Sequence, residues 1–517
     1  MNTQVVIKKA NESYVKIEAS EKYIEIEIQD KFSFEIPNAQ YDKRVINNKW
    51  DGIKRLYNRR TKLFPIGLVL KLLQFLKAQE YSYHIDPDLI PQSGIDMDDI
   101  KFVIEEVIDP HDNENPIFPY EHQMNAIHYM LNMGRTLCLS STSSGKSLMI
   151  YCVLRILQLV PEMEGKRMFV VVPSAHLVEQ MYSDFENYAK GSKVNWNVAR
   201  HCQKVNKDYK KFIDKQIVIT TWQSLSKLPR QVLDDMEAMF VDEVHGAKAD
   251  VLSKIVVDSI NCPIKHGLTG SLDGFESNEM FIEGLFGPRR VIMTAKESID
   301  KGIATPVDIN VLLLKYTDDY KNELANQLFE KDENGNKPKP KELYNIEKQF
   351  IYTIDKRLQF IKNLALSLEG NTLILVDSID KYQIPLYESI KKEHEHTYFV
   401  NGNVDTSDRK QYIDFMESDG GKVIKVATYG TMSTGVSIKN LNNLILGSSI
   451  KSLIKIIQTI GRMMRKHKNK ERAQIYDIVD DFSIGKYKGY MMKHAEKRIK
   501  IYSDEQHPVK FFPIHIK

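Results

Sequence analysis

Short apolar runs alternate with longer segments of helical periodicity over residues 118–306. The runs have the length of buried strands, and turn-forming residues bound them. Strands that alternate with helices indicate a parallel sheet covered by helices on both faces. The sequence therefore predicts an α/β domain, with strands at Thr136–Leu139, Met168–Val172, Gln216–Ile219 and Ala238–Val241.

The same alternation returns over residues 307–482 and predicts a second parallel-sheet domain in tandem with the first. A charged stretch at Lys331–Pro340 is predicted to be a mobile loop. The expected strands of this second domain are Thr372–Val376, Thr397–Val400, Val423–Ala427 and Asn443–Leu446.

Residues 1–95 have a different pattern. Tyr14–Glu18 and Tyr23–Ile28 alternate apolar and charged residues, as half-buried antiparallel strands do, and Leu68–Leu76 follows as a helix. We therefore expect a small α+β domain at this end of the chain.

Two further segments lie outside these domains. Residues 96–117 are acidic and rich in turn-forming residues, which predicts a connector. Residues 483–517 alternate lysine with tyrosine, methionine and isoleucine, which predicts a short helical extension packed on the second sheet domain.

Composition places the chain among soluble globular proteins. Its 517 residues are 42% hydrophobic and 27% charged. Since no apolar run approaches the roughly 20 residues that span a bilayer, we expect no membrane association. Met1–Gln4 lacks the apolar segment of a signal peptide, which predicts a cytoplasmic protein. The four cysteines are widely spaced and form no CxxC pair, which argues against a zinc ribbon or a disulfide framework.

One polar loop interrupts the first α/β domain where a strand ends and a helix begins. Backbone N–H groups and the helix dipole favour phosphate at such a place. Lys146 can reach the β- and γ-phosphates of ATP, and the Ser147 hydroxyl can ligate Mg²⁺. Ser140 stands where the usual pattern has its first glycine, so an ordinary polar turn is the alternative. The loop consists of Ser141, Thr142, Ser143, Ser144, Gly145, Lys146 and Ser147.

Two carboxylates follow the predicted strand Ala238–Val241. At the carboxyl edge of a parallel sheet they can face the polar loop of residues 141–147, which we call the phosphate loop. Asp242 would hold Mg²⁺, and Glu243 would orient and deprotonate the attacking water. The alternative is an acidic pair that caps the next helix, with His245 in a polar contact.

With these two motifs the first domain resembles the superfamily-two helicases of the DExH type, and further matches occur in the order of that family. Gln123 resembles the glutamine that reads adenine, and Leu268–Leu272 resembles the motif that couples hydrolysis to strand movement. Two more motifs resemble those that contact the nucleic-acid backbone, which implies contacts from Pro173, Ser174, Gln180, Thr221, Trp222 and Gln223.

The second domain completes the resemblance. Ala427–Ser437 resembles the motif that touches nucleic acid and nucleotide, which implies roles for Thr428 and Gly435. Gln458–Arg465 resembles the last motif, whose catalytic members here are Gln458, Arg462 and Arg465.

Arg462 and Arg465 lie three residues apart, so we expect both on one helix face. Such arginines neutralise charge on the transferred phosphoryl group, an effect of ~10³–10⁵ in rate. The resemblance implies that the two α/β domains are RecA-like motor domains. Because Lys146 lies in the first and the two arginines lie in the second, we expect hydrolysis only when both motor domains close on one nucleotide. A solvated basic face is the alternative.

Four stretches resemble, more narrowly, the UvsW-type recombination helicases of phages: Asn48–Gly52, Leu63–Leu68, Lys265–Leu272 and Gln458–Arg462. This resemblance implies 3′-to-5′ movement and action on branched and single-stranded DNA, including Holliday junctions, stalled forks, R-loops and RNA–DNA hybrids. We also expect a monomer in the cytoplasm of the host cell, with recombination or replication proteins as partners. Ser143 and Ser144 replace commoner glycines, and His122 replaces a commoner tyrosine.

A basic stretch with aromatic side chains lies within residues 1–95, and such a stretch suits a nucleic-acid backbone and its exposed bases. A solvated hairpin with Trp50 in the core is the alternative. The candidate contacts are Lys49, Trp50, Arg55, Arg59 and Arg60.

Three other functions remain open at this point. An RNA helicase would carry the same core motifs, because those motifs grip backbone rather than bases. The motor portion of a nuclease would need a carboxylate–lysine site, which we do not find outside the core. A nucleotide-gated binding or annealing protein would not need Lys146, Glu243 and Arg465 together.

Overall fold

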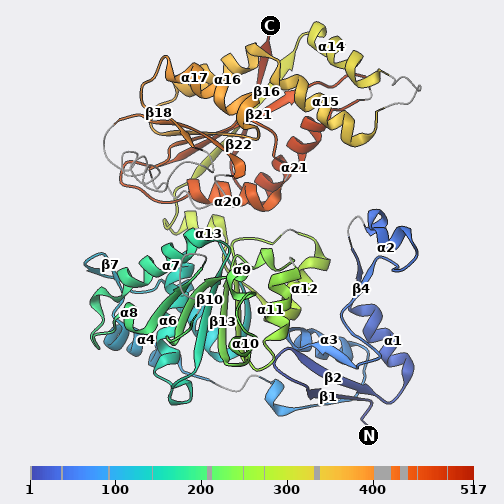
Figure 1. Cartoon of the computed structure of the whole chain (residues 1–517), viewed down its shortest axis with the longest axis vertical. Coiled ribbons are helices and arrows are strands. Elements are labelled where there is room, and N and C mark those ends of the chain that lie inside the picture. Colours follow the sequence, from blue (N-terminus) through green and yellow to red (C-terminus); the bar gives the residue numbers. More distant parts are fainter. Residues whose placement is uncertain are drawn as a thin grey trace. The chain divides into compact units, whose positions relative to one another are not determined.

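The computed structural model describes residues 3–36, 39–90, 94–141, 144–206, 212–248, 250–272, 274–330, 338–400, 421–430, 440–450, 452–485 and 487–517. The chain divides into two compact units, residues 1–294 and 295–517 (Figure 1). Each unit contains a seven-stranded sheet, which confirms the predicted pair of RecA-like α/β domains. Among the helices of the described residues, none is both long and apolar enough to cross a membrane.

The first unit begins with a small α+β domain, as predicted. Its four-stranded sheet has the order β5-β2-β1-β6. Strands β1 and β2 are antiparallel, and β6 is parallel to β1. The elements are β1 (Val5–Lys9), β2 (Tyr14–Ala19), α1 (Lys22–Lys31), β5 (Leu63–Pro65), α3 (Val69–Ala78) and β6 (Tyr83–Ile85), with a separate ribbon of β3 (Ser33–Glu35) and β4 (Ile53–Arg55).

The strand predicted at Tyr23–Ile28 is wrong, because these residues lie within helix α1. Ile24 and Ile28 are fully buried, whereas Ile26 between them is 43% exposed. A strand would place all three on one face, but a helix places only residues four apart together. Glu25 is buried as well and pairs with Lys62, whose Nζ lies 2.5 Å from Glu25 Oε1. This ion pair lets an apparently polar position face inward.

The predicted connector, residues 96–117, is not a simple linker. It contains helix α4 (Met97–Val103), which continues as a π-helical turn over Ile104–Ile108, and the hairpin of β7 (His111–Asp112) and β8 (Asn115–Pro116). Ile100, Ile104 and Ile108 are buried in the core beside the first large sheet. The acidic residues that suggested a connector are mostly exposed, some on this helical segment and others, Asp112 and Glu114, in the hairpin.

The first large sheet is parallel throughout, with the order β11-β12-β10-β13-β14-β9-β15. All carboxyl ends therefore lie along one edge, where ligands bind in open α/β sheets. The strands are β9 (Arg135–Ser140), β10 (Arg167–Val172), β11 (Cys202–Val205), β12 (Ile217–Thr221), β13 (Met236–Asp242), β14 (Ile264–Thr269) and β15 (Arg289–Met293).

Helices cover both faces of this sheet (Figure 1). Along β10, Val170 packs toward one set of helices, whereas Phe169 and Val171 pack toward the other. This alternation explains why the strand reads as a continuous apolar run. One face carries α5 (Glu121–Met133), α6 (Lys146–Gln158) and α7 (Ala175–Tyr188), and the other carries α11 (Asp250–Asp258) and α12 (Glu276–Phe286).

The sheet of the second unit has the order β18-β19-β17-β20-β21-β16-β22 and is also parallel. All four strands predicted in this part of the sequence are confirmed. The strands are β16 (Val307–Tyr316), β17 (Thr372–Val376), β18 (Thr397–Val400), β19 (Ile424–Thr428), β20 (Asn443–Leu446), β21 (Ala473–Asp481) and β22 (Val509–Ile516). Its helices include α13 (Ala295–Asp300), α14 (Asp318–Phe329), α15 (Pro340–Tyr352), α16 (Asp355–Ser367), α17 (Ile384–Lys391), α20 (Leu453–Met463) and α21 (Tyr490–Asp504).

The C-terminal segment contains the expected helix, α21, and also a strand that the sequence pattern did not predict. Strand β22 pairs with β16 from Ile309–Val509 to Tyr316–Ile516 and forms an edge of the sheet. Its exposed Phe511 and Phe512 break the alternation expected of a strand. Of the predicted loop at Lys331–Pro340, residues 331–337 lie outside the described residues, and Pro340 begins α15.

The small N-terminal domain is fixed to the first large sheet by buried polar contacts. Lys265 in β14 is fully buried, and its Nζ donates to the Glu12 carbonyl (3.0 Å), the Ser13 hydroxyl (3.0 Å) and the Val256 carbonyl (2.8 Å). Arg135, the first residue of β9, donates to the Glu12 carboxylate at 2.9 Å. The turn between β1 and β2 thus holds the amino ends of β9 and β14.

The N-terminal domain also packs closely against helix α12. Gly67 approaches helix α12 so closely that a Cβ atom there would lie 2.2 Å from the Glu283 carbonyl oxygen. Only glycine permits this approach. Lys54 lies 3.2 Å from the centre of the Phe281 ring of the same helix. The N-terminal domain is therefore a fixed part of the first unit.

The buried Lys265 predicts a pH-dependent stability. Burial, aided by the charge of Arg135, lowers the pKa of Lys265 from 10.5 to about 7. Between these values the unfolded chain holds a proton that the folded chain lacks, so stability rises with pH at up to roughly 1.4 kcal/mol per pH unit. We expect the melting temperature of the wild type to rise relative to that of Lys265→Met between pH 7 and 9. A difference that does not change with pH would contradict the burial of a titrating lysine.

Candidate active site

The phosphate loop joins β9 to α6, and its described residues are held by short polar contacts. The Ser140 hydroxyl donates to the Ser144 hydroxyl at 2.6 Å. Gly145 has φ of +80°, a left-handed conformation that favours glycine, and a Cβ atom there would lie 2.2 Å from Gln123 Nε2. Lys146 begins α6, with its ammonium 3.4 Å from the Ser140 carbonyl. Thr142 and Ser143, predicted to contact nucleotide, lie outside the described residues.

The loop has the features that a phosphate group requires. Ser141 Oγ is buried and has no hydrogen-bond partner among the described residues. The side-chain hydroxyl of Ser147 and the first N–H groups of α6 are at the amino end of the helix, where anions are favoured. The residues present therefore fit a bound triphosphate.

Gln123 holds this loop in place. Its amide nitrogen donates to the Ser144 carbonyl at 2.7 Å, and its amide oxygen accepts from the Tyr120 N–H at 2.8 Å. The Tyr120 ring is 58% exposed and stacks on His122, with 5.9 Å between ring centres. An aromatic face thus lies beside Gln123, although the sequence has histidine where tyrosine is commoner. The contact of Gln123 with adenine stays a prediction.

The two carboxylates lie at the carboxyl end of β13, which neighbours β14 in the sheet. Thr269 ends β14, and its hydroxyl lies 3.3 Å from Glu243 Oε2. His245 Nδ1 lies 3.3 Å from the same oxygen and 3.2 Å from the Thr269 hydroxyl. Glu243 itself has φ of +56°, which is uncommon for a residue with a side chain. The Glu243 carboxylate is thus held by His245 and Thr269, and the polar contact of His245 that the alternative included is present.

The two carboxyl groups differ in their affinity for protons. Burial and the adjacent charge of Glu243 raise the pKa of Asp242, although the charge of Lys146 opposes this rise. Burial also acts to raise the pKa of Glu243, but Lys146 and His245 outweigh it, so this pKa lies below its usual range. Glu243 is therefore the ionised partner, as the predicted base must be, while Asp242 would gain from a nearby cation.

The described residues could provide only part of the coordination of a magnesium ion. No group of three or more histidine, cysteine, aspartate or glutamate side chains that could hold a metal occurs within the described residues. Mg²⁺ usually takes one or two protein ligands and completes its octahedron with phosphate oxygens and water. Ser147 and Asp242 therefore fit a metal that arrives with the nucleotide.

The residues predicted to contact nucleic acid in this unit lie near the same edge. Pro173 and Ser174 follow β10, and the Ser174 hydroxyl caps α7 by accepting from the Leu177 N–H at 3.4 Å. Thr221 ends β12 and caps the short helix α9 (Trp222–Leu225) by accepting from the Ser224 N–H at 3.2 Å. Their contact with nucleic acid stays a prediction, as does that of the half-buried Gln180 on α7, the half-buried Trp222 and the exposed Gln223.

In the second unit, one prediction needs correction. Gln458 and Arg462 lie on α20, but this helix ends at Met463, so Arg465 does not share a helix face with Arg462. Lys470 Nζ donates to the Met463 carbonyl at 2.9 Å, and the Thr305 N–H donates to the Met464 carbonyl at 2.7 Å. These bonds take carbonyls that a continuing helix would use.

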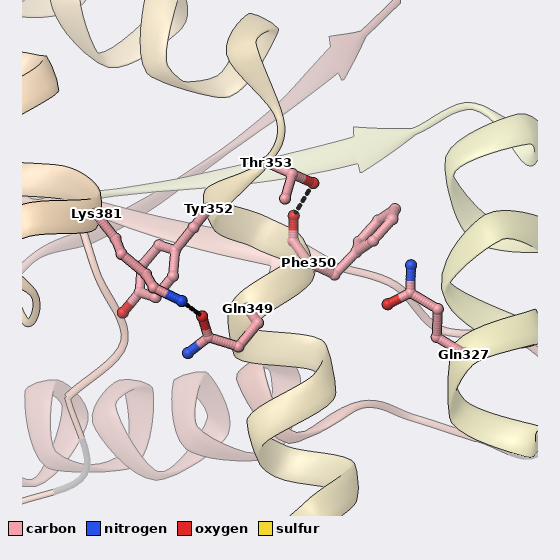
Figure 2. A pocket seen from close by; sticks show the side chains of 6 residues that line it. All are labelled: Gln327, Gln349, Phe350, Tyr352, Thr353 and Lys381. Carbon is pink, nitrogen blue, oxygen red and sulfur yellow. Dashed lines mark hydrogen bonds between the residues drawn. The ribbon is translucent and has the colours of Figure 1, made fainter.

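The other predicted residues of the second unit are only partly described. Thr428 ends β19 and is half-buried, whereas Gly435 lies outside the described residues. A surface pocket of about 430 Å³ lies between α14, α15 and Lys381, which follows β17 (Figure 2). The Lys381 ammonium donates to the Gln349 side chain there, and the Thr353 hydroxyl donates to the Phe350 carbonyl at 2.8 Å. Sequence reasoning did not select these residues.

The basic stretch of the N-terminal domain is partly engaged in local contacts. Trp50 is half-buried, donates to the Ile53 carbonyl at 2.9 Å and lies under the Arg44 guanidinium, 4.7 Å from the ring centre. Arg55 pairs with Asp51 at 2.6 Å. Lys49, Arg59 and Arg60 are exposed. Trp50 is thus not among the buried core residues, and the exposed cations are the better candidates for phosphate contacts.

Comparison with known proteins agrees with this geometry. The family described as DEAD/DEAH box helicase matches residues 120–260, and the Helicase conserved C-terminal domain matches residues 355–467. The family described as DNA helicase UvsW, N-terminal, matches residues 4–86.

Individual relatives extend these matches. The chain is 30% identical over 490 residues to the ATP-dependent DNA helicase uvsW of Enterobacteria phage T4, which covers 92% of each chain. It is 22% identical over 370 residues to putative helicase 22 of Sulfolobus islandicus filamentous virus, covering 69% of this chain and 63% of that one.

Solved structures give the same result. The crystal structure of T4 UvsW matches over 100% of both chains with 27% identity and a TM-score of 0.51. S. cerevisiae Dbp5 bound to RNA and ADP BeF3 matches 77% of this chain and 90% of that one, with a TM-score of 0.52; at 15% identity this shows the fold alone.

The paired parallel sheets and the motifs at their carboxyl ends define a superfamily-two helicase, an ATP-dependent enzyme that acts on nucleic acid. Within that class, the likeness over nearly the whole chain, including the N-terminal domain, shows that this chain belongs to the UvsW family of helicases.

Two variants should separate nucleotide binding from hydrolysis. Lys146→Ala removes the predicted charge-assisted phosphate contact and should weaken ATP binding roughly 10- to 100-fold. Glu243→Gln keeps the shape of the site but removes the predicted base, so ATP should still bind while turnover falls by ~10²–10⁴. Equilibrium binding of ATP and single-turnover hydrolysis check both effects. Full turnover in Glu243→Gln would show that Glu243 takes no part in hydrolysis.

Proposed function

We propose that this helicase hydrolyses ATP with Mg²⁺ to move along and remodel branched DNA. Branch migration of Holliday junctions, regression of stalled forks and unwinding of R-loops in phage recombination, replication and repair are the specific tasks. We further propose that it acts as a monomer in the cytoplasm of the infected cell. The observation that carries this proposal is the likeness to the T4 helicase over all three domains rather than over the motor alone.

The chain's own residues divide the work of hydrolysis. ATP would supply the phosphoryl group, and its Mg²⁺ would neutralise part of the negative charge of the phosphates. Lys146, with Ser141, Ser144 and the N–H groups of α6, would bind the phosphates, and Ser147 and Asp242 would hold the metal. Glu243 would take a proton from water while His245 and Thr269 orient its carboxylate.

The second unit would contribute positive charge and coupling to movement. We propose that Arg462 and Arg465 neutralise charge on the phosphoryl group and that Gln458 helps to place the attacking water. Gly435 and Thr428 would contact nucleotide and nucleic acid. Support for these roles comes from the order of the motifs and from the match to the helicase C-terminal family over residues 355–467.

The N-terminal domain would bind the duplex arms of the substrate through its basic stretch. Removing this whole domain is a poor test, because the deletion would leave the buried Lys265 and Arg135 without Glu12 and Ser13. Loss of binding could then follow from damage to β9 and β14. Substitutions at the exposed cations leave this buried interface intact.

We therefore expect a triple variant, Lys49→Ala, Arg59→Ala and Arg60→Ala, to bind forked DNA more weakly. If all three cations contact phosphate, the slope of log affinity against log salt should become shallower by roughly one per lost contact. Fluorescence anisotropy with forked DNA over a range of salt concentrations measures this. The matched control is the triple variant Lys22→Ala, Lys31→Ala and Lys77→Ala, which also removes three charges, from α1 and α3 of the same domain. An equal loss in both variants would show that the effect is net charge rather than a site.

The preferred substrate can be decided by comparing strand separation on a DNA fork, a Holliday junction, an RNA–DNA hybrid and duplex RNA. We expect ATP-dependent activity on the two branched DNA substrates and on the hybrid, and none on duplex RNA. Activity confined to RNA duplexes would instead support an RNA helicase. Tight binding without ATP-dependent strand separation on any substrate would support a nucleotide-gated binding protein.

A further inference from the structure

The hydroxyl of Ser147, the candidate magnesium ligand, already has a partner in the first unit. Ser147 Oγ lies 2.9 Å from the hydroxyl oxygen of Tyr188, the last residue of α7. Among the described residues, the Tyr188 hydroxyl makes no other hydrogen bond. A tyrosine 41 positions away in the sequence thus reaches the second residue of α6.

Packing fixes the Tyr188 ring independently of its hydroxyl. The ring contacts that of Tyr151 on α6, with 5.5 Å between ring centres, and Tyr151 also contacts Phe185 on α7 at 5.3 Å. These aromatic contacts join α6 to α7 and are worth about 0.5–1.5 kcal/mol per pair. A phenylalanine at position 188 would keep them and lose only the hydroxyl group.

The phenol group of Tyr188 suits this contact with Ser147. A phenol oxygen can accept a hydrogen bond, whereas Mg²⁺ prefers carboxylate, phosphate and water oxygens. Tyr188 therefore does not compete with Ser147 for a metal.

A serine hydroxyl that ligates a cation directs an oxygen lone pair at the metal, so its proton must point elsewhere. The Tyr188 oxygen lies where it can accept that proton. Removing a partner that orients a metal ligand in this way commonly weakens metal affinity.

We propose that Tyr188 is a positioning residue for magnesium: it accepts the hydrogen bond of Ser147 and so holds the serine oxygen toward the metal that accompanies ATP. This inference rests on the proposed use of Mg–ATP at this site. Tyr188 acts on the metal only through Ser147. Its place at the end of α7, a helix that Ser174 caps at its start, links the metal ligand to a helix with a predicted nucleic-acid contact.

The test is the magnesium dependence of nucleotide binding by Tyr188→Phe. A fluorescent N-methylanthraniloyl derivative of ATP is titrated into the full chain, first with EDTA and then at increasing Mg²⁺. We expect unchanged affinity without metal and a roughly three- to tenfold higher Mg²⁺ concentration at half-saturation. The melting temperature without nucleotide should stay within about 2 °C of the wild type, because the ring contacts remain.

Controls separate positioning from packing. Tyr182→Phe removes a phenol hydroxyl from the same helix, away from Ser147, and should leave the Mg²⁺ requirement unchanged. In a Ser147→Ala background, Tyr188→Phe should add no further change in Mg²⁺ requirement, since Tyr188 acts through the serine. Additive effects, tighter Mg²⁺ binding, or an unchanged Mg²⁺ requirement in Tyr188→Phe would each overturn the inference.

The same titration distinguishes this inference from the proposed function. A wild-type chain that binds the ATP derivative without any dependence on Mg²⁺ would contradict the proposed Mg–ATP site as a whole. A wild-type chain with a clear Mg²⁺ requirement that Tyr188→Phe shares would contradict only the role of Tyr188.

Discussion

The parallel pairing of β14 with β13 on one side and β9 on the other is the constraint on which the active site depends. It brings the ends of three strands that are far apart in sequence to one edge. Lys146 follows β9, Asp242 ends β13 and Thr269 ends β14. The hydrogen bonds from Thr269 and His245 to Glu243, and the effect of the Lys146 charge on both carboxyl groups, follow from this register.

The opposite ends of the same strands are fixed by the N-terminal domain. Arg135 begins β9 and Lys265 lies near the start of β14, and both donate to the turn that holds Glu12. A small domain outside the motor thereby helps to determine where two strands of the motor lie. Three hydrogen bonds offset only part of the cost of burying the Lys265 charge, so this interface depends on partners on both sides.

Sequence patterns were sufficient for four strands of each seven-stranded sheet and for the motifs at their ends, because buried parallel strands and phosphate loops have strong local signatures. They failed where tertiary contacts decide the outcome. The alternation in Tyr23–Ile28 suggested a strand, but the Glu25–Lys62 pair allows a helix. Arg465 lies past the end of α20, where Lys470 and Thr305 donate hydrogen bonds to the carbonyls of Met463 and Met464. Tyr188 belongs to no recognised sequence motif, so its proposed role could be inferred only from its distance to Ser147 in the structure.

The central claim is that one carboxyl edge of the first sheet holds ATP and its metal between Lys146, Ser147 and Asp242. Anomalous diffraction from crystals grown with a non-hydrolysable ATP analogue and Mn²⁺ in place of Mg²⁺ tests it most directly. The account predicts a manganese peak within coordination distance of the Ser147 hydroxyl and close to the Asp242 carboxylate, with the terminal phosphate against the Lys146 ammonium. A nucleotide or a manganese peak bound elsewhere on the first unit, with this edge empty, would contradict it.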